Sequence, residues 1–223
     1  HWNENAYECC DILMAISKQT YNINKHVCQR KPRIEGVDLT YVPHGINETE
    51  FYPIGEDHPD WHNMQNYKAE LLGDNVDAEM VFTFNSTDLP AVARALCKDY
   101  KVGFSSAKID SRTLNWFYNI SDCGINTSSA EGFGLSCMET IMSGTPVIVN
   151  TTGGLQDQCG FTKEDGSLIK ETDLTEKWPT NADKRYTDHG EWAFPVWPQI
   201  NLQGSPQTPY IYDSRANVKD IAT

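Results

Sequence analysis

One segment near the middle of the chain constrains the fold more than any other. Residues 120–126 predict a short strand, residues 131–142 carry apolar side chains at helical spacing, and residues 147–149 are β-branched and apolar, as in a buried strand. Gly144 is typical of a left-handed residue after a helix, and Pro146 prevents the helix from continuing. Strand, glycine loop, helix and strand form a βαβ unit. We therefore predict an α/β fold with a doubly wound parallel sheet and helices on both faces.

The loop before this helix predicts a ligand site. Ser128 and Ser129 are good helix N-caps, so we expect the helix to begin just after them. Gly132 and Gly134 have no Cβ, which lets a ligand approach the backbone. The first N–H groups of a helix have no partner within it and lie at the positive end of its dipole. We expect a phosphorylated, hydroxyl-rich ligand at this carboxyl edge of the sheet.

Two glutamates lie eight positions apart in this segment. Glu131 lies at the mouth of the loop and can accept hydrogen bonds from sugar hydroxyls. Glu139 comes about two turns later, on roughly the same side of the predicted helix, where a ribose diol is a plausible partner. The alternative is that both are ordinary helix residues. The strand that follows and the pair Gly153–Gly154 favour a ligand site.

These motifs resemble a known family of transferases. The Glu-Gly-Phe-Gly-Leu segment with its two glutamates (131–139), Gly-Thr-Pro-Val (144–147) and Gly-Gly-Leu (153–155) are similar to the C-terminal domain of the GT-B glycosyltransferases. The similar enzymes are the large retaining family 4 type, which includes glycogen and sucrose synthases and bacterial mannosyltransferases. Residues 10–17 resemble the end of the N-terminal domain of that fold, and residues 41–53 resemble the start of its C-terminal domain.

The resemblance implies a role for each matching residue. Glu131 would be the catalytic residue that contacts the donor sugar. The glycine loop would contact the sugar and the diphosphate. Leu135 and Glu139 would contact the ribose. Two serines after the 101–104 strand would contact the base. His44 and the glycine after it would face the cleft, although an ordinary turn histidine is the simpler interpretation. The donor-binding residues implied in this way are Gly132, Phe133, Gly134, Leu135, Glu139, Ser105, Ser106, His44 and Gly45.

The function implied is transfer of a hexose from a UDP- or GDP-linked sugar, with retention of configuration and with no metal or other cofactor. The acceptor is open: a glycan, a lipid, a protein or a nucleobase. The chemical task is to stabilise charge on the leaving diphosphate. A non-catalytic nucleotide-sugar-binding module is the alternative, and a sugar-nucleotide 2-epimerase is a weaker one. The Asp-x-Asp motif that holds a divalent cation in the other main glycosyltransferase fold is absent from the sequence.

The chain departs from the family pattern after its predicted strand at 80–84. The family has an Arg and a Lys in the next loop to bind the diphosphate, but residues 85–90 contain neither. The pattern also predicts that a helix and a strand are skipped, since residues 89–100 resemble a later helix. Either the chain lacks these parts, which would weaken catalysis, or a stretch between Phe84 and Asp88 is missing from the sequence. We favour the second, because losing one βα unit would leave a hole in the sheet.

We expect three parts along the chain. Residues 1–40 would be the end of an acceptor-side N-terminal domain and a linker, and most of that domain would lie outside this sequence. Residues 41–160 would form the Rossmann-like nucleotide-sugar domain, and residues 161–223 an aromatic and proline-rich insertion with a C-terminal extension. Residues 192–198 contain two prolines and are not expected to form a regular central strand. Elsewhere, residues 55–62 are predicted as a polar loop and residues 67–72 as a short helix.

Charge and cysteine content limit the partners. The net charge of −13 argues against strong binding to nucleic acid, and no apolar run is long enough to span a membrane. The cysteines are odd in number and form no Cys-x-x-Cys pair, so we expect reduced thiols in a cytoplasmic protein and no metal site. They are Cys9, Cys10, Cys28, Cys97, Cys123, Cys137 and Cys159.

Overall fold

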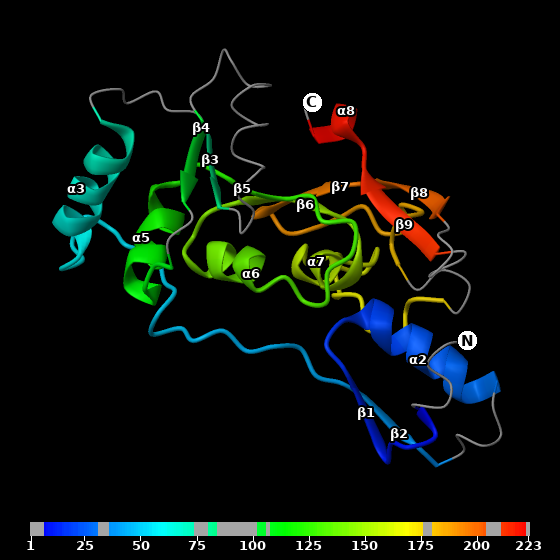
Figure 1. Ribbon diagram of the computed structural model, residues 1–223. Coiled ribbons are helices and arrows are strands. Elements are labelled where there is room, and N and C mark those ends of the chain that lie inside the picture. The colour runs from blue at the N-terminus through cyan, green and yellow to red at the C-terminus, as the bar shows by residue number, and fades with distance from the viewer. Residues whose placement is uncertain are drawn as a thin grey trace.

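The chain forms α/β structure with parallel strands, as expected (Figure 1). The computed structural model describes residues 7–30, 36–73, 80–83, 102–105, 108–175, 180–203 and 211–221. Within these ranges the strands pair in three parallel groups and one antiparallel hairpin.

A parallel sheet in the order β5–β6–β7 carries the predicted site. Its strands are β5 (Gly124–Asn126), β6 (Val147–Asn150) and β7 (Ala193–Val196). Helix α6 (Leu135–Met142) connects the first two strands, and α7 (Gly153–Gln158) follows β6. The predicted βαβ unit is therefore confirmed. Gly144 has a φ of 86° after α6, which is the left-handed conformation expected of it.

Strand β7 agrees with the prediction that residues 192–198 form no regular central strand, since it is an edge strand, but its regular pairing was not predicted. Four of these residues pair in parallel with β6, and Pro195 lies opposite Val149. Because β7 is at the edge of the three-stranded sheet, the missing N–H of Pro195 interrupts no second ladder. The chain then forms the antiparallel hairpin β8 (Pro198–Gln203) and β9 (Ile211–Ala216), followed by α8 (Val218–Ile221).

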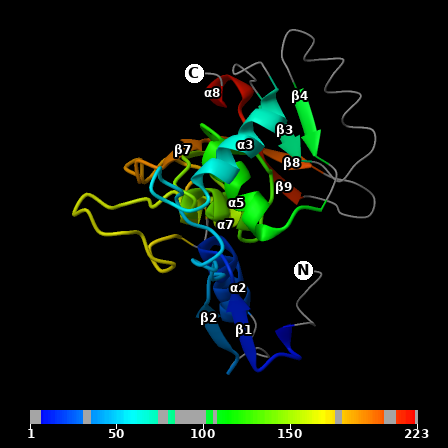
Figure 2. The same cartoon turned by 90° about the vertical axis from the view of Figure 1, so that its left-hand side faces the viewer.

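The N-terminal part is a separate βαβ unit. Strands β1 (Ile12–Ala15) and β2 (Asp38–Tyr41) pair in parallel and are joined by α2 (Lys18–Arg30). The hydroxyl of Ser17 accepts a hydrogen bond from the Thr20 N–H at 3.2 Å, which caps the start of α2. The unit projects from the rest of the molecule, and α2 lies against α7 (Figures 1 and 2).

The remaining elements are α3 (Trp61–Leu72), α5 (Ser111–Ile120) and the parallel pair β3 (Met80–Thr83) and β4 (Val102–Ser105). Two predicted boundaries were wrong. Trp61 and His62 begin α3 instead of belonging to a polar loop, and Ile120 ends α5, so the following strand begins only at Gly124. The loop at 85–90 and the helix predicted at 89–100 lie outside the described residues.

The buried core lies between the β5–β7 sheet and the helices α6 and α7. Val147, Val149 and Ala193 are at most 2% exposed and face these helices, and Leu155 and Phe161 are buried with them. Each of the Val, Leu and Phe side chains in this set contributes about 1.5–3 kcal/mol by leaving water. This packing fixes the ends of β5 and β6, where the site lies. The predicted domain limits at residues 40 and 160 stay a prediction.

Candidate functional site

A cavity of about 340 Å³ lies at the carboxyl ends of β5 and β6. Four segments meet there: the start of α2, the loop before α6, the start of α7, and strand β9 of the hairpin. Its lining residues are Gln19, Thr20, Ser129, Ala130, Glu131, Gly132, Thr152, Gly153 and Ser214.

Helix α6 begins later than predicted. Gly134 is the N-cap, with a φ of 87°, and Leu135 is the first helical residue. A left-handed residue cannot continue a helix, so the predicted start at residue 131 and the predicted caps Ser128 and Ser129 were wrong. Glu131 therefore lies in the loop, at the cavity wall, and does not share a helix face with Glu139.

The position of Glu139 is set by α5. Its Oε2 accepts a hydrogen bond from the Tyr118 hydroxyl at 2.9 Å, and the residue is half-buried. Burial, followed by the charge of Glu139, raises the pKa of Tyr118, so the phenol stays protonated and keeps donating. Glu139 does not line the cavity, although it belongs to the helix that begins beside it.

The glycine pair Gly153–Gly154 packs against the backbone of the loop before α6. A Cβ on Gly153 would overlap the carbonyl oxygen of Glu131, and a Cβ on Gly154 would overlap the backbone of Phe133. The Gly154 N–H donates to the Glu131 carbonyl at 3.2 Å, and the Gly153 N–H donates to Gln19 Oε1 at 2.6 Å. These glycines thus let two backbone segments touch, and both of their N–H groups already have acceptors within the protein.

The side-chain amide of Asn150 holds the hairpin at the cavity. Asn150, the last residue of β6, is fully buried, and its Nδ2 donates to the carbonyls of Ser128 at 2.9 Å and Ser214 at 2.7 Å. One amide therefore joins the loop before α6 to β9. Strand β9 becomes a wall of the cavity in this way.

The other predicted donor-binding residues are distributed as follows. The ring of His44 packs edge-on against that of Phe133, with centroids 5.3 Å apart, which brings the His44–Gly45 turn to the glycine loop. Gly45 faces open space, and Leu135 is 48% exposed at the start of α6. Ser105 is the last residue of β4, and Ser106 lies outside the described residues.

Sequence reasoning missed three of the polar lining residues. Gln19 and Thr20 come from α2, whose preceding strand was matched to the N-terminal domain, so the resemblance could have indicated that this helix faces the cleft. Ser214 comes from the hairpin, and no motif indicated it. Its position depends on the hydrogen bond from the Asn150 amide to the Ser214 carbonyl, which joins residues far apart in the sequence.

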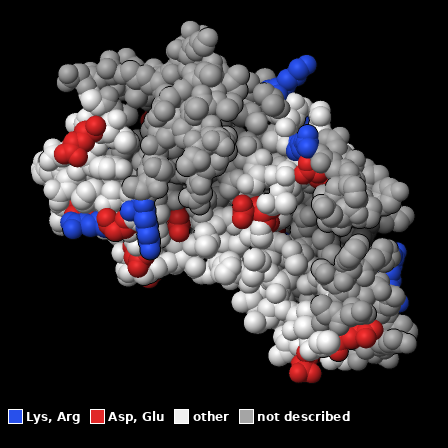
Figure 3. All heavy atoms as spheres, viewed as in Figure 1, with Lys and Arg blue, Asp and Glu red and all other residues white. Residues whose placement is uncertain are grey.

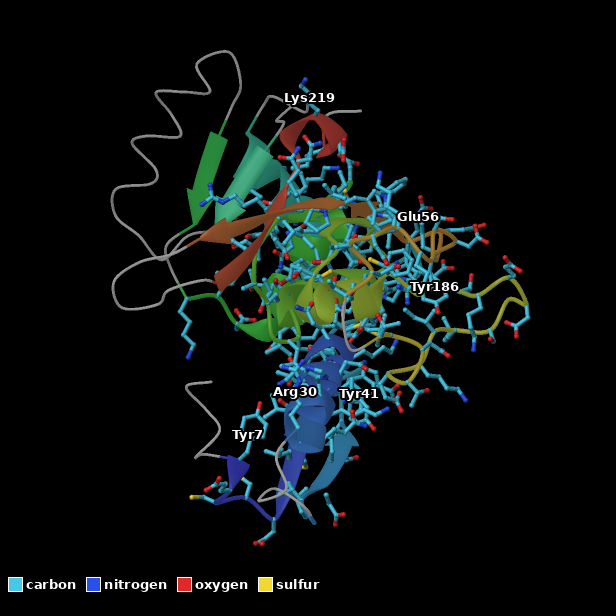
Figure 4. The ribbon with its side chains drawn as sticks, turned by 90° about the vertical axis from the view of Figure 1, so that its right-hand side faces the viewer. Tyr7, Arg30, Tyr41, Glu56, Tyr186 and Lys219 are labelled. Carbon is cyan, nitrogen blue, oxygen red and sulfur yellow. The ribbon has the colours of Figure 1, made fainter. Side chains whose placement is uncertain are left out.

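A buried carboxylate connects the N-terminal unit to α7. Asp157 Oδ2 accepts hydrogen bonds from the Lys18 N–H at 2.7 Å and from the Tyr41 hydroxyl at 3.4 Å, and no described group bonds its buried Oδ1. Figure 4 labels Tyr41 beside α2, where this unit meets the rest of the chain. Burial raises the pKa of Asp157 to about 6, against the lowering effect of Lys18. The contact is thus sensitive to protonation just below neutral pH.

The thiols near the site are neutral. Burial, and then the charge of Glu131, raises the pKa of Cys137 to about 12. The buried Cys137 and Cys159 are free thiols, whereas Cys97 lies outside the described ranges. Within the described parts of the chain, no group of three His, Cys, Asp or Glu side chains could hold a metal, and no helix is long and apolar enough to cross a membrane.

A larger hollow, of about 580 Å³, lies between the loops at 162–165 and 185–188. It contains none of the predicted site residues. Two of its cations already have partners: Lys163 is 3.3 Å from Asp173, and Arg185 is 2.9 Å from Asp183. We therefore place the candidate site at the smaller cavity. On the face in Figure 3, the Lys and Arg side chains are interspersed with acidic ones, so this face is mixed in charge.

Comparison with known proteins points to the same part of the chain. The family described as glycosyl transferases group 1 matches residues 101–177, about a third of the sequence. No curated protein matches the chain.

Several solved structures are similar. One is a sucrose-phosphate synthase from Thermosynechococcus elongatus, with 20% identity and a TM-score of 0.49 over 70% of this chain and 45% of that one. Another is the catalytic domain of starch synthase IV from Arabidopsis thaliana, with 15% identity and a TM-score of 0.49 over 75% and 44%. A third is the C-terminal domain of a glycosyl transferase group 1 family protein from Francisella tularensis, with 20% identity and a TM-score of 0.39 over 60% and 85%.

The chain spans less than half the length of the first two structures. Their TM-scores lie below 0.5, so the family match and the geometry of the cavity carry the functional assignment. The matched residues include the loop before α6, α6 itself, β6 and α7. The segment that forms most of the cavity therefore has the sequence features of glycosyl transferases group 1.

Proposed function

We propose that this chain carries the donor site of a glycosyltransferase that moves a hexose from a UDP- or GDP-linked sugar to an acceptor, with retention of configuration and without a metal. One observation carries the proposal: within the family-matched segment, the Glu131–Gly132 loop and the Thr152–Gly153 turn meet around one cavity. The hydroxyl, amide and carboxylate groups of its lining suit a ligand with many hydroxyls.

Glu131 is the proposed catalytic residue. The carbonyl oxygen of Glu131 accepts a hydrogen bond from the Gly154 N–H at 3.2 Å, which holds the backbone of the loop in place. Glu131 itself lines the cavity. A carboxylate placed there accepts hydrogen bonds from the hexose hydroxyls and orients the sugar. The backbone of Gly132, Phe133 and Gly134 then lies along the sugar and diphosphate.

The start of α6 is the proposed place of the diphosphate. The helix is eight residues long and begins directly after Gly134, so its first N–H groups and its dipole face the loop. They stabilise the negative charge that develops as the diphosphate leaves. In the proposed retaining reaction, the leaving diphosphate takes the proton of the acceptor hydroxyl on the same face of the sugar.

Glu139 is the proposed partner of the ribose hydroxyls. Tyr118 occupies its Oε2, which leaves Oε1 to accept from a diol. Ser105, Ser106, His44 and Gly45 remain proposed donor-site residues at the base and the cleft. The acceptor stays open between a glycan, a lipid, a protein and a nucleobase, and a cytoplasmic location stays a prediction.

A non-catalytic nucleotide-sugar-binding module is the second candidate. It is favoured by one feature: among the described residues that line the cavity, none is a lysine or arginine that could bind a diphosphate. Binding of a nucleotide sugar without turnover would select this candidate.

The test is a calorimetric screen of the protein against UDP, GDP and ADP and their sugars, without metal, followed by assays of sugar transfer and of donor hydrolysis. We expect one nucleotide class to bind, and we expect Glu131→Ala to abolish turnover while the protein stays folded. Wild-type turnover in that variant would overturn the assignment of Glu131. Absence of binding by every nucleotide would overturn the proposed function.

A further inference from the structure

Gln19 connects helix α2 to the floor of the cavity. One atom of its side-chain amide lies 2.6 Å from the Gly153 nitrogen and 3.5 Å from Gln156 Nε2. A backbone N–H can only donate, so the atom that faces Gly153 must be the amide oxygen, Oε1. The amide nitrogen of Gln19 therefore points away from Gly153.

The second contact supports this orientation. Gln156 is 1% exposed, and its Oε1 accepts hydrogen bonds from the Asn181 N–H at 2.7 Å and the Thr180 hydroxyl at 3.2 Å. Its Nε2 is therefore the group left to face Gln19, and Nε2 is a donor. Two independent donors thus converge on one oxygen of Gln19.

The Nε2 of Gln19 then remains a donor on a residue that lines the cavity. Gln19 is half-buried and lines the cavity together with Thr20, Ser129 and Glu131. In the part of the chain that the structure describes, no group accepts a hydrogen bond from this nitrogen. Water or a ligand in the cavity that Gln19 lines can supply the acceptor.

The lining indicates which part of a ligand lies here. Thr20, Ser129 and Ser214 carry hydroxyls, which donate and accept, and Glu131 carries a carboxylate, which accepts only. A phosphate offers only acceptors and is disfavoured next to a carboxylate. A sugar hydroxyl can accept from Gln19 and donate to Glu131 at the same time.

We propose that Gln19 is a specificity-determining residue for the transferred sugar: its amide N–H donates to a hydroxyl oxygen of the hexose, while its carbonyl oxygen ties α2 to Gly153. This inference rests on the proposed function and adds a residue from α2 to the site. A sugar that lacks the matching hydroxyl leaves the donor unpaired and binds less tightly.

The variant Gln19→Glu separates the two roles. A carboxylate has two acceptor oxygens, so the bonds to Gly153 and Gln156 remain, but the donor is lost. Gln65→Glu, on the distant helix α3, adds the same charge away from the cavity and is the matched control. Thermal midpoints are measured for the three proteins, and dissociation constants by calorimetry for UDP, UDP-glucose, GDP and GDP-mannose.

We expect the thermal midpoint of Gln19→Glu to stay near that of Gln65→Glu. Its affinity for the bound nucleotide sugar should fall about tenfold, equivalent to about 1.4 kcal/mol, while its affinity for the free nucleotide changes by less than about threefold. Unchanged affinity for the nucleotide sugar would overturn the inference. Equal losses for nucleotide and nucleotide sugar would do so too, because they indicate a general effect of charge.

A large loss of thermal stability in Gln19→Glu would contradict the acceptor assignment of Oε1 and overturn the inference as well. Failure of the proposed function gives a different result. If the wild-type protein bound neither nucleotides nor nucleotide sugars, the proposed function would fall, and this inference with it.

Discussion

Protonation of Asp157 should control part of the stability of the fold. The carboxyl is almost completely buried, and its pKa rises from 3.8 to about 6 because burial disfavours the charged form. The groups facing it are Lys18 and Tyr41, which lower its pKa, and Glu171, which raises it. A pKa that is raised in the folded state gives stability that is complete below about pH 4 and is lost as the pH rises through 6.

The size of the effect follows from the shift in pKa. A shift of two units corresponds to about 3 kcal/mol over the full range, and about half of this falls between pH 5 and pH 8. Asp157→Asn removes the titration and keeps an oxygen for the Lys18 N–H. We therefore expect the free energy of unfolding of this variant, relative to wild type, to rise by about 1–2 kcal/mol from pH 5 to pH 8.

Urea unfolding at the two pH values, followed by tryptophan fluorescence, measures this difference. The exposed Asp122→Asn, which also removes one negative charge, is the control and should follow wild type. The difference in free energy of unfolding between Asp157→Asn and wild type is compared at pH 5 and pH 8. If it changed by less than about 0.5 kcal/mol between these pH values, the buried carboxylate would not be the titrating group, and the reasoning would be refuted.

Other substitutions test the rest of the structure. Gly154→Ala should lower the thermal midpoint by several degrees or prevent folding, because its Cβ would overlap the backbone of Phe133, whereas Gly55→Ala has open space and should leave the midpoint unchanged. Asp60→Asn should cost about 1–3 kcal/mol in urea unfolding, because Asp60 accepts two hydrogen bonds from Arg112 of α5 and lies at the start of α3; a loss below 0.5 kcal/mol would contradict this. Glu139→Ala should weaken nucleotide binding by about 1–3 kcal/mol in calorimetry, and unchanged binding would remove Glu139 from the proposed ribose site.

The sequence predicted the elements around the site because their signals are local. The β-branched run in β6, Gly144 after α6 and the helix α6 itself each follow from spacing and from conformational preference within a few residues. The edge position of β7 could not be predicted in this way. A strand that contains Pro195 is acceptable only if one side of it is unpaired, and that depends on which strand lies beside it in space.

The geometry of the candidate site was predictable only in part. Glu131, Gly132 and Gly153 were identified and do line one cavity. The start of α6 was misplaced by four residues, because the serines before Glu131 give a strong capping signal, whereas the left-handed Gly134 depends on close packing against Leu155. Gln19 reaches the site through contacts over more than a hundred positions, which no local pattern contains.

The Asn150 amide has a consequence for how such a site can change over time. Because one side chain holds both the loop before α6 and the β9 hairpin, an insertion or deletion in the hairpin shifts a cavity wall without altering a single residue of the loop. Variation in length near Ser214 is therefore a route by which relatives of this chain could acquire a new ligand preference while keeping the same loop sequence. A designer could use that route as well, by grafting hairpins of different lengths behind an unaltered Asn150.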